Sequence, residues 1–230
     1  MNRVFIDVDT QADFCAPGGA LFVAGAPAAM GGCARLVNAA VAAGAPLLGS
    51  VDSHAHDAWE FAGAAGVGPR GERPGFPPHC VKGTAGWLKL PATLPERFYF
   101  VPVVDDPDAA ARVPANTQAV YFEKEVYSLF ANPNAARVLD ARAPAGPVEF
   151  VVFGVATDYC VRAAALGLLA WIGERCARAG SRVVVARDAV AAVTADGGDD
   201  ALDEMRAAGV ELRDTDAILS GESPAPRNGA

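Results

Sequence analysis

The sequence is poor in histidine and in long apolar runs, and its basic residues are outnumbered by acidic ones. Among 230 residues, 27 are Asp or Glu and 19 are Lys or Arg, so the formal net charge at pH 7 is -8. Such a chain repels nucleic acid and anionic membranes, and we expect a small-molecule partner instead. No apolar run approaches membrane-spanning length and no signal-peptide pattern follows Met1, which predicts a cytoplasmic protein.

Paired cysteines are also absent. The five cysteines are an odd number, lie far apart and form no C-x-x-C pair, which argues against a disulfide framework and against a cysteine zinc site. We expect reduced thiols, most of them structural: Cys15, Cys33, Cys80, Cys160 and Cys176.

Short apolar runs rich in β-branched residues alternate with Ala-rich segments of helical length. The runs predict strands over 3–8, 45–51, 98–103, 118–123, 148–155, 182–189 and 210–215. The segments between them predict helices over 28–43, 133–141, 160–179 and 197–208. Continuously apolar strands are buried on both faces, so we expect a three-layer α/β/α fold with a mainly parallel central sheet. We expect one domain over 1–220 and a disordered tail over 221–230.

Ligands of such folds bind beyond the carboxyl ends of the strands, so polar residues at strand ends are candidates for a site. Asp9 ends the first strand, within DVDTQADF, although an aspartate there can also simply cap a turn. Lys124 ends the strand that precedes EVYSLF, although a lysine there is usually a solvated charge.

Two of the three histidines lie in VDSHAHDAWEF, 51 to 61. Asp52 and His54 are two residues apart, so in extended chain their side chains share a face and can converge on one ion. Carboxylate and imidazole suit zinc, iron or manganese, and His56 and Glu60 are further candidates. The alternative is a solvated polar loop. The third histidine, His79, lies in the Gly- and Pro-rich loop GFPPHCVKGTAGW, which is either functional or a loop with a partly buried histidine.

Cys160 follows the buried strand 148–155 and begins the next predicted helix. Amides at a helix N-terminus stabilise a thiolate, which predicts a thiol pKa lowered toward neutrality and a nucleophile. The alternative is a small, inert, buried residue. A nucleophilic cysteine needs a base, and Asp9 is available if His54 and His79 bind a metal. Lys124 would then stabilise the thiolate and hold the carboxylate.

Taken together, five segments resemble the isochorismatase-like cysteine hydrolases and, among them, the nicotinamidases. They occur in the family's order from Val4 to about Leu212 and read DTQADF (9–14), DSH (52–54), FPPHCVKGTAG (76–86), EKEVYSLF (123–130) and GVATDYCVR (154–162). The resemblance implies a catalytic triad of Asp9, Lys124 and Cys160. It also implies one divalent metal ion (Zn, Fe or Mn) bound by Asp52, His54 and His79, with Glu60 at a position where some relatives have a further ligand. His56 falls outside the pattern and is expected at the surface or in contact with the ligands.

The resemblance further implies a cis peptide before Ala156, and an oxyanion hole made by the amides of Ala156 and Cys160. The expected reaction is hydrolysis of nicotinamide, or of a similar heteroaromatic amide, to the acid and ammonia through a thioester. In nicotinamidases the ring nitrogen of the substrate meets the metal. Four aromatic residues are expected to line the pocket: Phe14, Phe76, Tyr127 and Tyr159.

Departures from the nicotinamidase pattern leave the substrate open. Phe76 stands where tryptophan is familiar and Tyr159 where histidine is, which favours as an alternative a cysteine hydrolase acting on another small amide, ureide or N-carbamoyl compound. A catalytically silent binding module is disfavoured because Asp9, Lys124 and Cys160 are all present. A vinyl-ether hydrolase is disfavoured because that chemistry needs no cysteine. A homo-oligomer is compatible with the sequence, since small α/β hydrolases commonly self-associate.

Overall fold

The computed structural model describes residues 1–64, 66–68, 73 and 75–221. Of the tail predicted over 221–230, all but Gly221 lies outside the described residues. The strands are β1 (Asn2–Val8), β2 (Leu47–Asp52), β3 (Phe98–Val101), β4 (Ala119–Lys124), β5 (Val148–Val155), β6 (Arg182–Ala191) and β7 (Glu211–Arg213). The α-helices are α1 (Ala12–Cys15), α2 (Ala26–Ala43), α3 (Ala109–Arg112), α4 (Ala135–Arg142), α5 (Arg162–Gly173), α6 (Ala195–Ala207) and α7 (Thr215–Ser220). Shorter turns are Pro91–Thr93, Leu129–Ala131 and Cys176–Arg178, which are 3-10 helical, and Thr157–Val161, which is π-helical.

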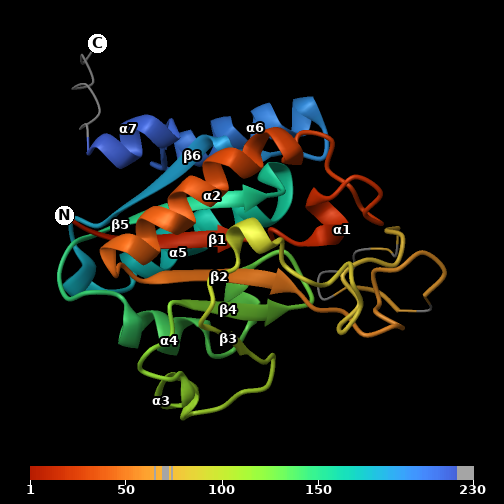
Figure 1. Ribbon diagram of the computed structural model, residues 1–230, viewed down its shortest axis with the longest axis horizontal. Coiled ribbons are helices and arrows are strands. Elements are labelled where there is room, and N and C mark those ends of the chain that lie inside the picture. Colours follow the sequence, from red (N-terminus) through yellow and green to blue (C-terminus); the bar gives the residue numbers. More distant parts are fainter. Residues whose placement is uncertain (65, 69–72, 74, 222–230) are drawn as a thin grey trace.

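The strands form one seven-stranded sheet in the order β3-β4-β2-β1-β5-β6-β7, and all of its pairings are parallel. Parallel neighbours need crossover connections, which the helices supply. The order changes direction at β1, because β2 lies on one side of it and β5 on the other. A crevice therefore opens beyond the carboxyl ends of β1 and β5, and in Figure 1 the long loops gather at that end of the sheet.

Helices cover both faces of this sheet, which confirms the predicted three-layer α/β/α fold. Alternate residues of β1 point to opposite faces: Val4 and Ile6 belong to one buried cluster, and Phe5 belongs to the other. The first cluster packs against α4, α5 and α6, and the second packs against α2 and α7. The prediction of one domain over 1–220 stays a prediction.

Most predicted boundaries lie within two residues of the observed ones, and two of the differences have a local cause. The strand predicted to reach residue 103 ends at Val101, because Pro102 has no amide hydrogen for the ladder. The helix predicted over 160–179 runs only from Arg162 to Gly173. Beyond it a 3-10 turn directs Arg178 inward, where its guanidinium donates to the carbonyl of Pro144. The short helices α1, α3 and α7 were not predicted.

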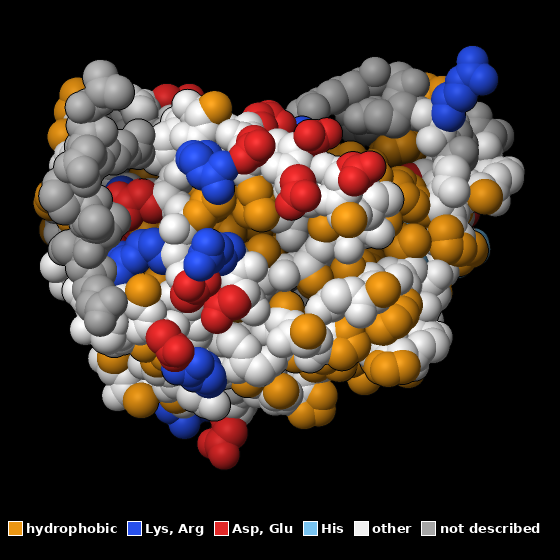
Figure 2. Space-filling model, turned by 90° about the horizontal axis from the view of Figure 1, so that it is seen from above, with side chains coloured by type: hydrophobic (Ala, Val, Ile, Leu, Met, Phe, Trp, Pro, Cys, Tyr) orange, Lys and Arg blue, Asp and Glu red, His pale blue; other side chains and the backbone are white. Residues whose placement is uncertain are grey.

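The described helices include none long and apolar enough to cross a membrane. On the side of the molecule that carries α6 and α7, acidic and basic side chains are intermingled (Figure 2). Some of them form surface ion pairs, including Arg35 with Asp216 at 2.5 Å and Arg187 with Asp214 at 2.5 Å.

Candidate active site

Four adjacent strands, β4, β2, β1 and β5, deliver the candidate catalytic residues to one place. Asp52 and Lys124 are paired in register at the ends of β2 and β4, and Asp9 follows the end of β1. Cys160 follows β5, and the backbone there passes unusually close to β1. A Cβ at Gly154 would lie 2.0 Å from the carbonyl oxygen of Val8, so only glycine fits, and its φ of +116° also favours glycine.

The ammonium of Lys124 lies between the carboxylate of Asp9 and the thiol of Cys160. Its Nζ is 2.8 Å from Oδ2 of Asp9 and 3.4 Å from Sγ of Cys160. The other carboxylate oxygen of Asp9 accepts a hydrogen bond of 2.8 Å from the hydroxyl of Ser50. Asp9 and Lys124 are fully buried and Cys160 is nearly so. Lys124 is therefore a buried residue of the site and not the solvated lysine that is usual at a strand end.

Burial is the largest influence on the pKa values of Cys160 and Asp9. It raises the pKa of the Cys160 thiol well above its usual range, and the ammonium of Lys124 opposes only part of that rise. The prediction of a thiol pKa lowered toward neutrality is therefore wrong, because desolvation of the buried thiol is the largest influence and raises its pKa. Burial raises the pKa of Asp9 as well, with Lys124 again opposing it.

The backbone before Cys160 has an irregular conformation. The peptide bond between Val155 and Ala156 is cis, as the resemblance implied. The chain then turns through the π-helical segment Thr157–Val161 and continues as α5. The carbonyl oxygen of Ala156 accepts from the amides of Tyr159 and Val161, at 3.1 and 3.0 Å, which holds the turn that presents Cys160.

Asp52 belongs to two neighbouring clusters. Its Oδ1 accepts a hydrogen bond from Lys124, and its Oδ2 lies 3.8 Å from Nε2 of His54 and 3.8 Å from Nε2 of His79. Gln11 holds the backbone of Asp52 from both sides, because its Oε1 accepts from the Asp52 amide and its Nε2 donates to the Asp52 carbonyl, each at 2.8 Å. The same Nε2 donates to the carbonyl of Trp87 at 2.8 Å, which ties the loop of His79 to this position.

A second carboxylate, Glu60, approaches both imidazoles. Its Oε1 lies 3.0 Å from Nε2 of His54 and 3.2 Å from Nε2 of His79. Ligand atoms of Asp52, His54 and His79 all lie within 4.8 Å of one another, and all three residues are buried. The second ring nitrogen of His79 lies 2.9 Å from the carbonyl oxygen of Pro77, a contact that leaves Nε2 directed at the cluster.

The cluster is suited to a cation. Both ring nitrogens of His54 are buried without a hydrogen bond, although Nε2 faces the carboxylates. Burial opposes protonation of His54, but the adjacent carboxylates of Asp52 and Glu60 outweigh burial and raise its pKa to about 9. Two carboxylates and two imidazoles are a donor set that accepts zinc, iron or manganese. His56 takes no part, since its side chain is 90% exposed and its nearest ionic neighbour is Asp57 at 3.9 Å.

A pocket of about 470 Å³, its mouth included, opens over Cys160 and the metal-ligand candidates. All four aromatic residues predicted for its wall line it: Phe14, Phe76, Tyr127 and Tyr159. The rings of Tyr127 and Tyr159 are 5.2 Å apart, and those of Phe76 and Tyr159 are 6.2 Å apart. Sequence reasoning missed the aliphatic part of the wall, since nothing in a single sequence marks these residues as neighbours: Leu21, Val23, Val126 and Val193.

Sequence reasoning also missed the polar residues that support the site. Besides Ser50 and Gln11, Asp13 holds the loop of His79, because its carboxylate accepts from the amide of Cys80 at 2.7 Å and from the amide of Ala20 at 3.0 Å. Gln11 and Asp13 lie within the quoted DTQADF segment, so their identity was visible in the sequence. Their partners were not, because the segments are far apart in the chain.

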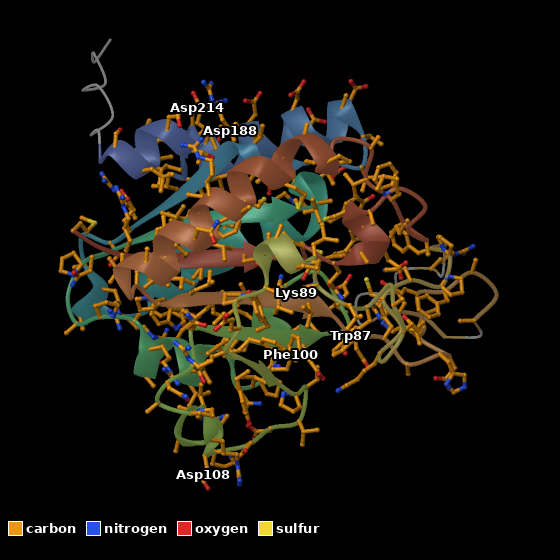
Figure 3. The ribbon with its side chains drawn as sticks, in the orientation of Figure 1. Trp87, Lys89, Phe100, Asp108, Asp188 and Asp214 are labelled. Carbon is orange, nitrogen blue, oxygen red and sulfur yellow. The ribbon has the colours of Figure 1, made fainter. Side chains whose placement is uncertain are left out.

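A second buried ion pair anchors the far end of the same loop. Lys89 lies in the interior of the molecule (Figure 3), and its Nζ is 3.0 Å from Oδ2 of Asp7 and 2.7 Å from the hydroxyl of Thr10. It also lies 4.3 Å from the ring centroid of Tyr121. Asp7 and Lys89 are both fully buried. This network joins the loop to β1 on the face of the sheet that carries Phe5 and Tyr121, whereas Cys160 belongs to the cluster on the other face.

A family model described as the isochorismatase domain matches residues 3–217. The chain is 32% identical over 218 residues to the nicotinamidase/pyrazinamidase of Mycobacterium tuberculosis (strain ATCC 25618 / H37Rv), a match that covers 91% of this chain and 97% of that protein.

Two solved structures have similar folds. The pyrazinamidase of Pyrococcus horikoshii in complex with zinc has a TM-score of 0.68 at 28% identity, over 93% of this chain and 99% of that one. PnC1 of L. infantum in complex with nicotinate has a TM-score of 0.66 at 25% identity, over 94% of each chain. The family model spans nearly all of the described residues, and the chain therefore belongs to the isochorismatase family.

Proposed function

We propose that the protein is a metal-dependent cysteine amidohydrolase that converts nicotinamide, or a similar heteroaromatic amide, to the acid and ammonia. The observation that carries the proposal is the position of Lys124, whose ammonium contacts Asp9, Cys160 and the metal-ligand candidate Asp52 at the floor of one pocket. The similarity to nicotinamidases and pyrazinamidases supports hydrolysis of a carboxamide C–N bond.

The first step is attack of Cys160 on the carboxamide carbon. Because burial raises the pKa of the thiol and so keeps it protonated, Asp9 has to take the proton as the C–S bond forms. Lys124 stabilises the resulting negative charge and keeps Asp9 in place. The proposed oxyanion donors are the backbone amides of Ala156 and Cys160, which would receive the charge on the substrate oxygen.

The second step breaks the C–N bond. Protonated Asp9 gives its proton to the leaving nitrogen, which departs as ammonia and leaves a thioester on Cys160. Water then attacks the thioester carbonyl, with Asp9 accepting one proton of the water, and the C–S bond breaks. The acid is released and the proton returns to the thiol, so the resting state is restored without an oxidant or reductant.

The pocket also supports a flat heteroaromatic substrate. Aromatic rings at Phe14, Phe76, Tyr127 and Tyr159 offer surfaces against which a substrate ring can pack. The metal ion would be held by four residues that line the pocket, Asp52, His54, His79 and Glu60. When bound, the ion would supply a Lewis-acidic contact for the ring nitrogen of the substrate. Zinc is the first metal to try, because the similar pyrazinamidase of P. horikoshii was solved with zinc.

The test is ammonia release from nicotinamide by the purified protein, with and without chelator. Cys160→Ala is the active-site variant, and Cys176→Ala is the matched control, because Cys176 is an exposed cysteine outside the pocket. We expect turnover that is abolished by Cys160→Ala and by chelator, restored by added divalent metal, and unchanged by Cys176→Ala.

Two results would change the proposal. Turnover that survives Cys160→Ala would rule out the thioester route. If nicotinamide is untouched while pyrazinamide, aliphatic amides, ureides or N-carbamoyl compounds release ammonia in a Cys160-dependent way, the substrate assignment is wrong and the hydrolase assignment stands. Replacement of Tyr159 by His and of Phe76 by Trp would then test whether these two wall positions changed the substrate.

A further inference from the structure

Asp158 lies close to the nucleophile, but its side chain binds the chain segment after β6. Its Oδ1 accepts a hydrogen bond of 3.0 Å from the amide of Val193, and its Oδ2 accepts one of 3.2 Å from the amide of Thr194. One carboxylate thus holds two consecutive amides. We call this pair of hydrogen bonds the Asp158 clamp.

The clamp connects the turn of Cys160 with a wall of the pocket. Val193 lines the pocket, and the residue is 44% exposed. A large apolar side chain at a pocket mouth gains contact when a substrate covers it. The position of Val193 therefore affects how well the pocket fits a substrate, and the clamp ties that position to the turn that carries Cys160.

The next residues leave the clamp little freedom to move. Thr194 begins α6 as its N-cap, with its hydroxyl accepting from the amide of Gly197 at 3.2 Å. A Cβ at Gly197 would lie 2.6 Å from the Thr194 hydroxyl and 3.0 Å from Oδ2 of Asp158. The first turn of α6 can approach the clamp this closely only because residue 197 has no side chain.

We propose that Asp158 is a positioning residue that fixes Val193 on the pocket wall, and that Val193 is a determinant of which substrates fit. Asp158 does not act on the reacting atoms in this account. It sets the width of the pocket mouth through Val193. The proposal is tested in two parts. The access part measures alkylation of Cys160 and is independent of the proposed function. The substrate part measures KM and kcat and rests on the proposed function.

The access part measures how easily reagents of two sizes reach Cys160. Iodoacetamide is the small reagent and N-benzylmaleimide the bulky one, and alkylation is followed by mass spectrometry of the peptide that contains Cys160. The ratio of the two rates cancels any change in the reactivity of the thiol itself. We compare Asp158→Ala, Asp158→Asn and Val193→Ala. The matched control is Asp200→Ala, because Asp200 is an exposed acid of α6 and the two hydrogen bonds of the clamp do not involve it.

We expect Asp158→Ala and Val193→Ala to raise the ratio of bulky to small reagent rates by about fivefold or more, since either change widens the mouth. Asp158→Asn keeps one acceptor oxygen and should give a smaller rise, and Asp200→Ala should give none. The double variant Asp158→Ala/Val193→Ala should show less than the product of the two single effects, because both act on one wall. Ratios unchanged by Asp158→Ala, or fully multiplicative effects in the double variant, would overturn the proposal.

The substrate part uses an amide that the wild-type protein hydrolyses. For Asp158→Ala we expect KM to rise about tenfold, which corresponds to about 1.4 kcal/mol, with kcat within about twofold of wild type. A loss of kcat at unchanged KM would contradict a positioning role through the pocket wall. If the wild-type protein hydrolyses no amide, the proposed function fails, and the alkylation ratios still decide the role of Asp158.

Discussion

Lys124 donates a hydrogen bond to one oxygen of Asp52, and the other oxygen of the same carboxylate faces the imidazoles of His54 and His79. A single buried carboxylate therefore belongs both to the candidate triad and to the candidate metal site. A substitution at Asp52 should therefore change both the reactivity of Cys160 and the binding of the metal, whereas a substitution at His54 should mainly change the binding of the metal.

Replacement of Asp52 by Asn tests this link. We expect the metal dissociation constant to rise by at least about tenfold, because a charged ligand is lost. We also expect faster alkylation of Cys160 at neutral pH, because the negative charge of Asp52 disfavours the thiolate and occupies Lys124. His54→Ala is the control, with weaker metal binding and a smaller change in alkylation. Chelator competition and iodoacetamide kinetics measure the two quantities, and equal alkylation rates in both variants would contradict the link.

Replacement of Lys124 by Met should damage both stability and turnover. It leaves the carboxylates of Asp9 and Asp52 buried without their cation, which we expect to cost about 3–5 kcal/mol in urea unfolding. Turnover should fall about a hundredfold or more, since the proton transfer to Asp9 loses its stabilising charge. Arg162→Met is the control: the side chains of Arg162 and its partner Glu204 are 43% and 51% exposed, and loss of this surface pair should cost less than about 1 kcal/mol. Similar costs for the two variants would contradict the prediction.

Replacement of Gln11 by Met keeps the side-chain size and removes three hydrogen bonds, two buried ones to Asp52 and a partly buried one to Trp87. We expect metal affinity to fall about 10- to 100-fold, as for the loss of a group that orients a ligand. Gln118→Met is the control, because Gln118 lies at the opposite end of the sheet, where its side-chain oxygen accepts a hydrogen bond from the amide of Arg97. Metal affinity would be measured by chelator competition, and unchanged affinity in Gln11→Met would show that Asp52 is positioned without Gln11.

Glu149 should contribute a pH-dependent part of the stability. Burial by itself would raise its pKa, but hydrogen bonds from Arg3 and Arg182, at 2.6 and 2.8 Å, outweigh burial and lower the pKa. A lowered pKa means that the contribution is present above the unfolded pKa of about 4.3 and is lost as the pH falls through the folded value. We expect Glu149→Gln to cost about 2 kcal/mol at neutral pH and progressively less in acid.

Urea unfolding in chelator, from neutral pH down to about pH 3.5, checks this sign. Glu96→Gln is the control, because Glu96 is exposed, and its difference from wild type should be small at every pH. A difference between Glu149→Gln and wild type that grows as the pH falls would show that the pKa of Glu149 is raised.

Much of the fold was predictable because its strands are buried on both faces. A strand such as β5, covered by helices on each side, must be continuously apolar, and that run is visible in the sequence. The ends of such runs were also visible, which is why Asp52 and Lys124 could be placed together at one edge of the sheet. The end of α5 was less predictable, since the inward turn of Arg178 depends on carbonyl groups contributed by another part of the chain.

The sequence by itself determined which chemical groups are present, their order along the chain and the sheet edge at which they meet, because local periodicity and residue type are properties of the chain alone. Only the tertiary structure decided that Lys124 is buried, that the pKa of Cys160 is raised, and that Asp52 lies between two clusters. Desolvation depends on the packing of every neighbouring segment, and so do long-range contacts such as that of Asp158 with Val193. These properties arise only when distant parts of the chain have come together.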